Sequence, residues 1–152
     1  MSLYCVHSGA LSGVDALSVE VEVNAGEGGN PDMKLVGLPD AAVRESRDRV
    51  VTAIAISGLK RPRGRTTLNL APADLKKEGP GFDLPNALAM ATLPEGTDPD
   101  LLPQWCCVGE LALDGTVRPV RGVLATALEA KKRGRKKLMV PASVAAEASV
   151  VS

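Results

Sequence analysis

An alternating segment over residues 17–23 constrains the fold more than any other feature of this sequence. Apolar residues occupy every second position of it, namely Leu17, Val19, Val21 and Val23. Because successive side chains of a strand point to opposite faces of its sheet, this period of two predicts a half-buried strand. Residues 3–7, followed by a glycine-containing turn at 9–13, form the expected hairpin partner.

A long helix is predicted over residues 41–57. Asp40 can cap its first turn, and Gly58 can end it. Its expected buried stripe has helical spacing and comprises Val43, Val50, Val51, Ile54, Ala55 and Ser57. Opposite charges four residues apart suit the solvated face of the same helix, in the pairs Arg44 with Asp48 and Glu45 with Arg49.

The remaining segments predict alternating strands and helices. Strands are expected at 33–36, 66–70 and 138–140, and a hairpin over 107–113 and 116–120 around Asp114-Gly115. A second helix, capped by Asp83, should bury Leu84, Ala87, Leu88 and Ala91. A third, over 121–133, should bury Val123, Leu124, Ala127 and Leu128, and a short one should begin near 143. Loops are expected at 25–31, 71–81 and 93–104. The order of elements indicates a single α+β domain over residues 1–152.

Composition excludes several classes of function. Aromatic residues make up only 2% of the chain, which argues against a base-stacking platform for single-stranded nucleic acid. The formal net charge is zero, so no global field favours nucleic acid or membrane. Cys5, Cys106 and Cys107 lack zinc-binding spacing and His7 is the sole histidine, so we expect reduced thiols and no metal site. No signal peptide or membrane-spanning run is apparent, and we expect a cytoplasmic protein.

The common catalytic motifs are missing from the sequence. It contains neither the Gly-x-x-x-x-Gly-Lys-Ser/Thr loop that cradles phosphates nor a Gly-x-Gly-x-x-Gly string, so this chain alone should not hydrolyse ATP. A serine nucleophile needs a base within hydrogen-bond reach, and Ser8 cannot face the neighbouring His7 in an extended strand. A Ser–Lys dyad needs no histidine and is considered separately.

Four segments, in order, resemble the Lon protease domain. Lys77-Glu-Gly-Pro80 is similar to the Lon loop Lys-Asp-Gly-Pro-Ser-Ala-Gly, which contains the nucleophilic serine. The others are Gly37-Leu-Pro-Asp40 with Arg44-Glu-Ser46, the segment 109–122 beginning Gly109-Glu-Leu, and the segment 130–141. This resemblance implies a ribosomal-protein-five-domain-2-like fold, with helices packed on a mixed sheet.

Two departures from the Lon pattern bear on catalysis. Gly81 stands where the resemblance places the nucleophilic serine, and Leu124 stands where it places the general-base lysine. Glycine has no hydroxyl to attack and leucine cannot take a proton. The alignment therefore predicts a domain that has lost both halves of the Ser–Lys dyad.

The whole chain resembles the Mg-chelatase-like ComM/YifB family. The matching segments are Val36-Gly-Leu-Pro-Asp40 and its continuation to Val50, Asn69-Leu-Ala-Pro-Ala-Asp74, Phe82-Asp-Leu-Pro85 and Gly109-Glu-Leu-Ala-Leu-Asp-Gly115. In that family such an N-terminal domain precedes an AAA+ ATPase domain, which this chain does not include. The resemblance implies a parent protein that uses ATP and Mg²⁺, forms a homo-hexamer and acts as a DNA helicase in branch migration during natural transformation.

Charged clusters are the candidate binding residues. Phosphate contact could involve Lys60, Arg61, Arg63 and Arg65, or Lys131, Lys132, Arg133, Arg135, Lys136 and Lys137. Each cluster could equally be a solvated turn or a set of helix-terminal cations. A protein interface could involve Arg44, Glu45, Asp48, Arg49, Asp74, Lys77 and Glu78.

Three functional hypotheses remain open from the sequence. The favoured one is a non-catalytic accessory domain of an AAA+ ATPase that serves ring assembly, interdomain contact or DNA engagement. The second is a Lon-like serine peptidase with a displaced nucleophile, for which Ser46 and Ser57 are the candidates. The third is a module that recruits a protein partner and does not contact DNA.

Overall fold

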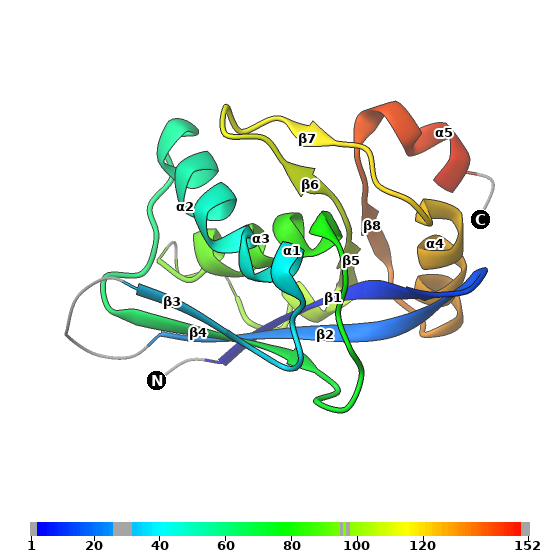
Figure 1. Cartoon of the computed structure of the whole chain (residues 1–152), viewed down its shortest axis with the longest axis horizontal. Coiled ribbons are helices and arrows are strands. Elements are labelled where there is room, and N and C mark those ends of the chain that lie inside the picture. The colour runs from blue at the N-terminus through cyan, green and yellow to red at the C-terminus, as the bar shows by residue number, and fades with distance from the viewer. Residues whose placement is uncertain (1–2, 26–31, 95, 97, 150–152) are drawn as a thin grey trace.

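A mixed β-sheet forms the base of the domain (Figure 1). The computed structural model describes residues 3–25, 32–94, 96 and 98–149. In this part of the chain, six strands pair in the order β3-β4-β2-β1-β5-β8. Their bounds are β1 Leu3–Ser12, β2 Asp15–Ala25, β3 Asp32–Val36, β4 Arg65–Ala71, β5 Trp105–Cys107 and β8 Lys137–Met139. The predicted α+β class with a mixed sheet is confirmed.

The predicted hairpin of β1 and β2 is the centre of this sheet. The two strands pair antiparallel from Leu3 opposite Asn24 to Ser12 opposite Asp15. Val19, Val21 and Val23 are fully buried, as the alternation predicts. Leu17 is 43% exposed instead, because it lies near the turn, where the hairpin extends beyond the main core. β2 also pairs antiparallel with β4, whereas β3–β4, β1–β5 and β5–β8 are parallel.

The helix predicted over 41–57 is two helices in the structure. α1 spans Ala41–Arg44 and α2 spans Ser46–Ile56, with Glu45 between them. The cap is confirmed, because Asp40 Oδ1 accepts a hydrogen bond from Val43 N at 2.8 Å. The break rotates the buried stripe, so that Ser46 and Ala53 are buried with Val50 and Ile54. Ala55 and Ser57, predicted to be buried, are exposed.

α3 spans Asp83–Thr92, directly after a 3-10 turn over Pro80–Phe82. The predicted cap is wrong: Phe82 holds the N-cap position, and the Asp83 carboxylate makes an ion pair instead. The buried residues are Pro85, Asn86, Ala89 and Met90. The predicted stripe of Leu84, Ala87, Leu88 and Ala91 is only half-buried, because α3 is covered on more than one side.

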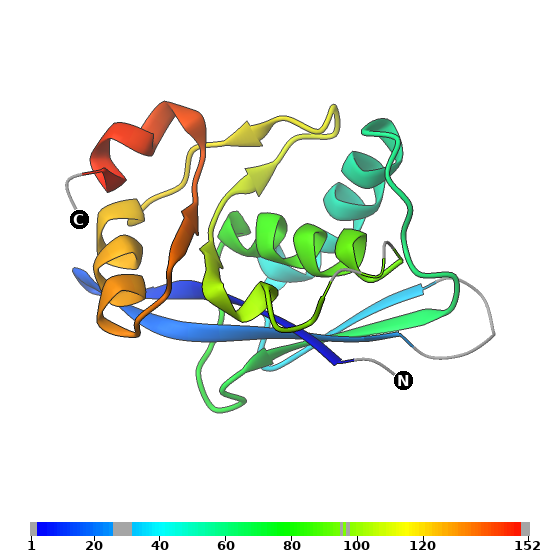
Figure 2. The same cartoon turned by 180° about the vertical axis from the view of Figure 1, so that it is seen from behind.

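These helices cover one face of the sheet, and a short hairpin lies beyond them (Figure 2). The core between the layers is almost wholly aliphatic and includes Val6, Val21, Leu70, Val50 and Met90. The hairpin β6 (Glu110–Leu111) and β7 (Val117–Arg118) surrounds the predicted turn, in which Gly115 has φ +90°. It is shorter than predicted, because Cys107 belongs to β5 in the main sheet.

α4 (Val123–Lys132) packs against the other face of the β1–β2 hairpin, near the hairpin turn (Figure 1). A Cβ at Gly9 would lie only 2.9 Å from Thr126 Oγ1, so glycine permits this close approach. Val123 and Ala127 are buried as predicted, but Leu124 is half-buried and Leu128 is 53% exposed. The chain continues through β8 to α5 (Ala145–Ala148).

Two further predictions concern a strand near the C-terminal end and an early loop. The predicted strand over 138–140 corresponds to β8 and is only half-buried. The loop predicted at 25–31 lies outside the described residues from position 26 onward. Among the residues that the structure does describe, no helix is long and apolar enough to cross a membrane.

Candidate functional site

A groove opens where the Lon resemblance places the nucleophile. It encloses about 730 Å³ between residues 9–12 of β1, the loop 75–82 apart from Lys77, and residues 119–121. Gly81 lines the groove. Leu124 lies in the first turn of α4, three residues after the lining residue Arg121. The fold thus brings three separate segments of the chain to one site.

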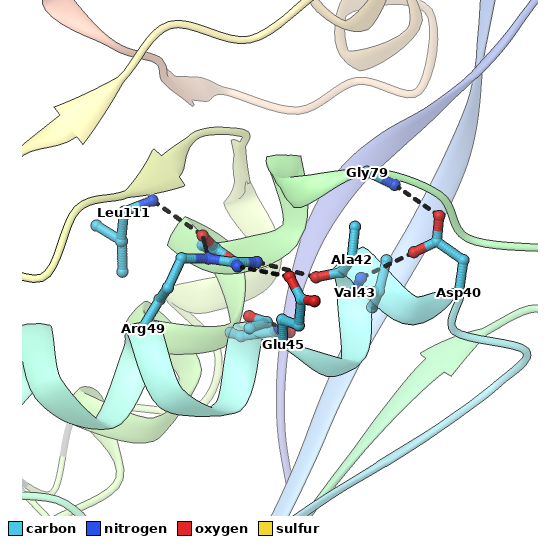
Figure 3. A network of polar contacts seen from close by, with 10 residues as sticks. Asp40, Ala42, Val43, Glu45, Arg49, Gly79 and Leu111 are labelled. Atoms are coloured by element: carbon cyan, nitrogen blue, oxygen red, sulfur yellow. Dashed lines mark hydrogen bonds and ion pairs between the residues drawn. The ribbon is translucent and has the colours of Figure 1, made fainter.

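Asp40 fixes the loop that forms one wall of this groove. Its backbone N donates to Lys77 O at 2.9 Å, and Lys77 N donates to Leu38 O at 3.0 Å. Figure 3 shows the Asp40 carboxylate between two backbone donors, Val43 N at 2.8 Å and Gly79 N at 3.2 Å. The helix cap and the groove wall therefore depend on one side chain, which has no oxygen left without a partner.

The interior position of Lys77 removes it from the predicted interface. The residue is fully buried, and its Nζ donates a hydrogen bond to the carbonyl of Pro72. Burial lowers the pKa of Lys77 from its ordinary value. Its side chain cannot serve as a surface contact as the sequence suggested. Asp74 and Glu78 of the same loop are exposed, and Glu78 lies 3.6 Å from Lys76.

A forked ion pair joins the helices beside the groove (Figure 3). Arg49 Nε lies 2.6 Å from Asp83 Oδ2, and Arg49 Nη2 donates to Asp83 Oδ1 at 3.0 Å and to Ala42 O at 2.9 Å. Leu111 N also donates to Asp83 Oδ2, at 3.0 Å. The hydrogen bond with Asp83 raises the pKa of Arg49, which keeps its charge.

This arrangement corrects the prediction for the 44–49 face. Arg49 is committed to Asp83 and is not available as an exposed interface residue. Arg44, Glu45 and Asp48 are exposed, as a surface role requires. The Glu45–Arg49 pair is present at 3.6 Å, but it is the outer and longer contact of Arg49.

The candidate displaced nucleophiles lie outside the groove. Ser46 is fully buried and accepts a hydrogen bond from Asn86 Nδ2 at 3.1 Å. Ser57 is exposed at the C-terminal end of α2. Among the described residues that line the groove, Ser12 is the one with a hydroxyl group, and it was not considered from the sequence.

A second hollow collects basic residues at the other end of the sheet. It encloses about 350 Å³ and is lined by Asp32, Met33, Lys34, Leu35, Arg44, Arg47 and Arg65. Arg47 is paired with Asp32 at 2.6 Å, and no ion pair involves Lys34, Arg44 or Arg65 within the described residues. Of the first predicted cluster, Arg65 reaches this hollow, whereas Lys60, Arg61 and Arg63 do not line it.

In the second predicted cluster, after α4, two of the six cations have intramolecular partners. Arg133 Nε donates to Glu129 Oε1 at 2.9 Å, and Lys137 Nζ lies 5.1 Å from the centre of the Trp105 ring. Arg135 is half-buried. Lys131, Lys132 and Lys136 are the exposed cations that remain for a surface contact.

Potential metal-ligating side chains come closer together than the sequence suggested. Cys5 and His7 of β1 and Glu20 of β2 each offer a ligand atom, and these atoms all lie within 4.8 Å of one another. Cys106 and Cys107 are buried, and burial raises the pKa of Cys106 to about 12.

Comparison with known proteins identifies the family. A family model described as subunit ChlI of Mg-chelatase matches residues 19–144. The chain belongs to this ChlI family. YifB of Escherichia coli (strain K12) is 47% identical over 136 residues, which cover 90% of the chain and 27% of YifB. The competence protein ComM of Haemophilus influenzae is 44% identical over 152 residues, which cover the whole chain and 30% of ComM.

A more distant relative agrees with the resemblance to the Lon protease domain. Lon protease 2 of Syntrophobacter fumaroxidans is 26% identical over 120 residues, which cover 74% of the chain and 15% of that protein. The predicted membership in the ComM/YifB group of the ChlI family is confirmed. The chain spans less than a third of the length of YifB and ComM.

Sequence reasoning missed several residues of both sites in this ChlI-family chain. Lys34 joins the basic hollow because β3 pairs parallel with β4, from Asp32 opposite Arg65, and Arg47 joins it through its ion pair with Asp32. The spacing of Arg44 and Arg47, one helical turn apart, was the available signal. Ser12 carried no local signal, because the groove forms only where the end of β1 meets the loop at 75–82 and residues 119–121.

Proposed function

We propose that this chain is a non-catalytic accessory domain of a Mg-chelatase-like AAA+ ATPase of the ComM/YifB type, in which it precedes the ATPase domain. The observation that carries the proposal is Gly81 in the wall of the groove. The position that the Lon resemblance assigns to the nucleophile has no side chain, and Leu124 stands at the position of the base. The groove then serves as a contact surface within the ATPase and does not catalyse a reaction.

The peptidase alternative receives little support from the surroundings of its candidate serines. Ser46 is fully buried and hydrogen-bonded to Asn86, so a substrate cannot reach it without unfolding α2. Ser57 is far along the chain from the groove loop and does not line the groove. Ser12 does line it, and so does Lys76, so Ser12 is the position at which a displaced nucleophile must be tested.

Peptide hydrolysis tests the proposal. We expect the chain to release no fluorophore from a fluorogenic peptide and no fragments from casein. The wild-type chain is compared with Ser12→Ala and, as a matched control on an exposed serine outside the groove, Ser57→Ala. Turnover by the wild type that disappears in Ser12→Ala and persists in Ser57→Ala would contradict the proposal and establish the peptidase alternative.

Engagement of DNA is the role that the basic hollow supports within this proposal. Arg44 and Arg65 meet there from α1 and β4, with Lys34 beside them. Cations grouped in this way can replace several counterions on one phosphate backbone at once. The exposed Lys131, Lys132 and Lys136 offer a second, separate contact surface. Arg135 is half-buried and is a weaker candidate than the sequence suggested.

Salt-dependent binding to duplex DNA tests this role. We expect the affinity to fall steeply as salt rises. The double variant Arg44→Glu/Arg65→Glu should reduce the slope of log K against log salt by about 1 for each phosphate that the protein no longer neutralises. The matched control is Lys131→Glu/Lys132→Glu, which reverses two exposed charges elsewhere. A larger effect in the control would assign DNA binding to the second cluster. Absence of binding by the wild type would favour the protein-recruiting module.

The parent protein supplies the remaining expectations. We propose that ATP and Mg²⁺ bind to the AAA+ domain, that neighbouring subunits of a homo-hexamer and the AAA+ domain itself are the partners of this chain, and that the assembly is cytoplasmic. Arg44, Glu45, Asp48, Asp74 and Glu78 are exposed and could take part in such contacts. Their replacement should weaken assembly of the full-length protein without changing the stability of this domain.

A further inference from the structure

Three side chains with metal-binding chemistry face away from the main core of the sheet. Cys5 and His7 are two residues apart on β1, so both point to the face opposite the buried Val6. The antiparallel register places Glu20 of β2 directly opposite His7. This cluster is separate from the groove, because none of its three members lines that cavity, which begins at Gly9, two residues after His7.

Their ligand atoms are already close together. The atoms offered by Cys5, His7 and Glu20 all lie within 4.8 Å of one another. Cys5 Sγ donates to Glu20 Oε1 at 3.1 Å. Bond lengths to tetrahedral Zn²⁺ of about 2.3 Å for sulfur and 2.0–2.2 Å for nitrogen and oxygen imply ligand separations of roughly 3.4–3.8 Å. Side-chain rotations that move these atoms by about an ångström would therefore bring them to tetrahedral zinc-ligand separations.

The imidazole of His7 supplies a second and independent observation. His7 is only 7% exposed, and its Nδ1 is buried without a hydrogen-bond partner among the described residues. A buried polar nitrogen that is left unsatisfied costs free energy, about 1–3 kcal/mol. A cation bound to this nitrogen would satisfy its lone pair.

We propose that Cys5, His7 and Glu20 form a three-ligand site for Zn²⁺ or a similar borderline-soft divalent cation, with a fourth position open to water. The donor set of one sulfur, one nitrogen and one carboxylate oxygen matches the preferences of zinc and excludes magnesium and calcium, which prefer oxygen ligands. On binding, the Cys5 S–H bond breaks, the sulfur bonds the metal, and the proton leaves to solvent.

The surrounding charges determine how strongly a cation is held. Burial, and then the hydrogen bond to Glu20, raises the pKa of Cys5 well above its ordinary value, so the thiol keeps its proton until a metal displaces it. Burial, and then the nearby Arg135, lowers the pKa of His7, which keeps the imidazole in its neutral, ligating form. Glu22, opposite Cys5, adds negative charge, while Arg135 opposes the cation.

Titration of the metal-free chain with Co²⁺ tests the site. We expect one equivalent to bind, with the intense near-ultraviolet absorption that a cobalt–thiolate bond produces, and Zn²⁺ to displace it. Cys5→Ser should abolish that absorption. Glu20→Gln should weaken binding by at least about tenfold, since even partners outside the coordination shell contribute ~10–100-fold. Glu22→Gln is the matched control, because this neighbouring carboxylate accepts a hydrogen bond from Asn69 and is not a ligand.

Three outcomes of this titration would overturn the proposed metal site. Cobalt–thiolate absorption that persists in Cys5→Ser, equal weakening by Glu20→Gln and Glu22→Gln, or no binding by the wild type would each overturn the proposal. Thermal unfolding of every metal-free variant shows whether it is folded. His7→Gln gives a second, independent ligand variant should Cys5→Ser fail to fold, and it must also lower the affinity at least about tenfold.

Discussion

At the scale of single residues, the ion pair between Arg49 and Asp83 connects more of the fold than any other polar contact described. The Asp83 carboxylate is fully buried and receives both the guanidinium fork and the backbone N–H of Leu111. Arg49 also donates to Ala42 O, so the contact joins α1, α2, α3 and β6. Removal of one charge would leave the other without its partner.

We expect Asp83→Asn to lower the free energy of unfolding by roughly 3–5 kcal/mol, the usual cost of breaking one side of a buried pair. Urea denaturation followed by circular dichroism measures the change. Glu45→Gln is the matched control, because the Glu45 side chain is 68% exposed and lies 3.6 Å from the same guanidinium. It should cost less than about 1 kcal/mol. Similar destabilisation by the two variants would contradict this role of Asp83.

The role of Asp83 could not be predicted from its neighbours in the sequence. An aspartate before a helical stripe with proline in its first turn is typical of an N-cap. The preceding 3-10 turn, however, moves the helix start, and the partner of Asp83 lies 34 residues earlier in the chain. Asp40, in contrast, was predicted correctly, because its capping bond is made three residues away.

At the scale of elements, periodicity predicted where helices and strands occur better than which side they bury. The alternation of β2 located a strand and its core face, since a period of two leaves only two choices. Along α4 half of the apolar residues are alanines, which mark no face clearly. Thr126, which was not among the residues predicted to be buried, is buried against Gly9, while Leu128 points outward.

The different burial of Val123 and Leu128 in α4 leads to a stability prediction. Val123→Ala should lower the free energy of unfolding by roughly 1–3 kcal/mol, because it opens a cavity between α4 and the buried side chains of Val108 and Ala148. Leu128→Ala removes a larger side chain but an exposed one, and should change stability by less than about 0.5 kcal/mol. Thermal or urea unfolding of the pair checks this. Greater destabilisation by Leu128→Ala would mean that Leu128 is buried, as predicted from the sequence, and would contradict its exposed position.

At the scale of the whole molecule, the groove depends on connections that no local pattern specifies. β5 and β8 add to the edge of β1 after long excursions of the chain, and α4 then packs beside the end of β1. Only this order brings residues 9–12, 78–82 and 119–121 together. The sequence located Gly81 and Leu124 through resemblance to the Lon domain. Composition and spacing alone contained no reason to associate them.

The absence of a working nucleophile in the groove is the central claim, and a peptide boronate tests it most directly. Boronates form a tetrahedral adduct with an activated serine hydroxyl, whichever substrate the enzyme prefers. We predict that boron NMR of the chain with a saturating peptide boronate shows only the free, trigonal species. A tetrahedral signal that disappears in Ser12→Ala, and remains in Ser57→Ala, would contradict the claim and identify the groove as an active site.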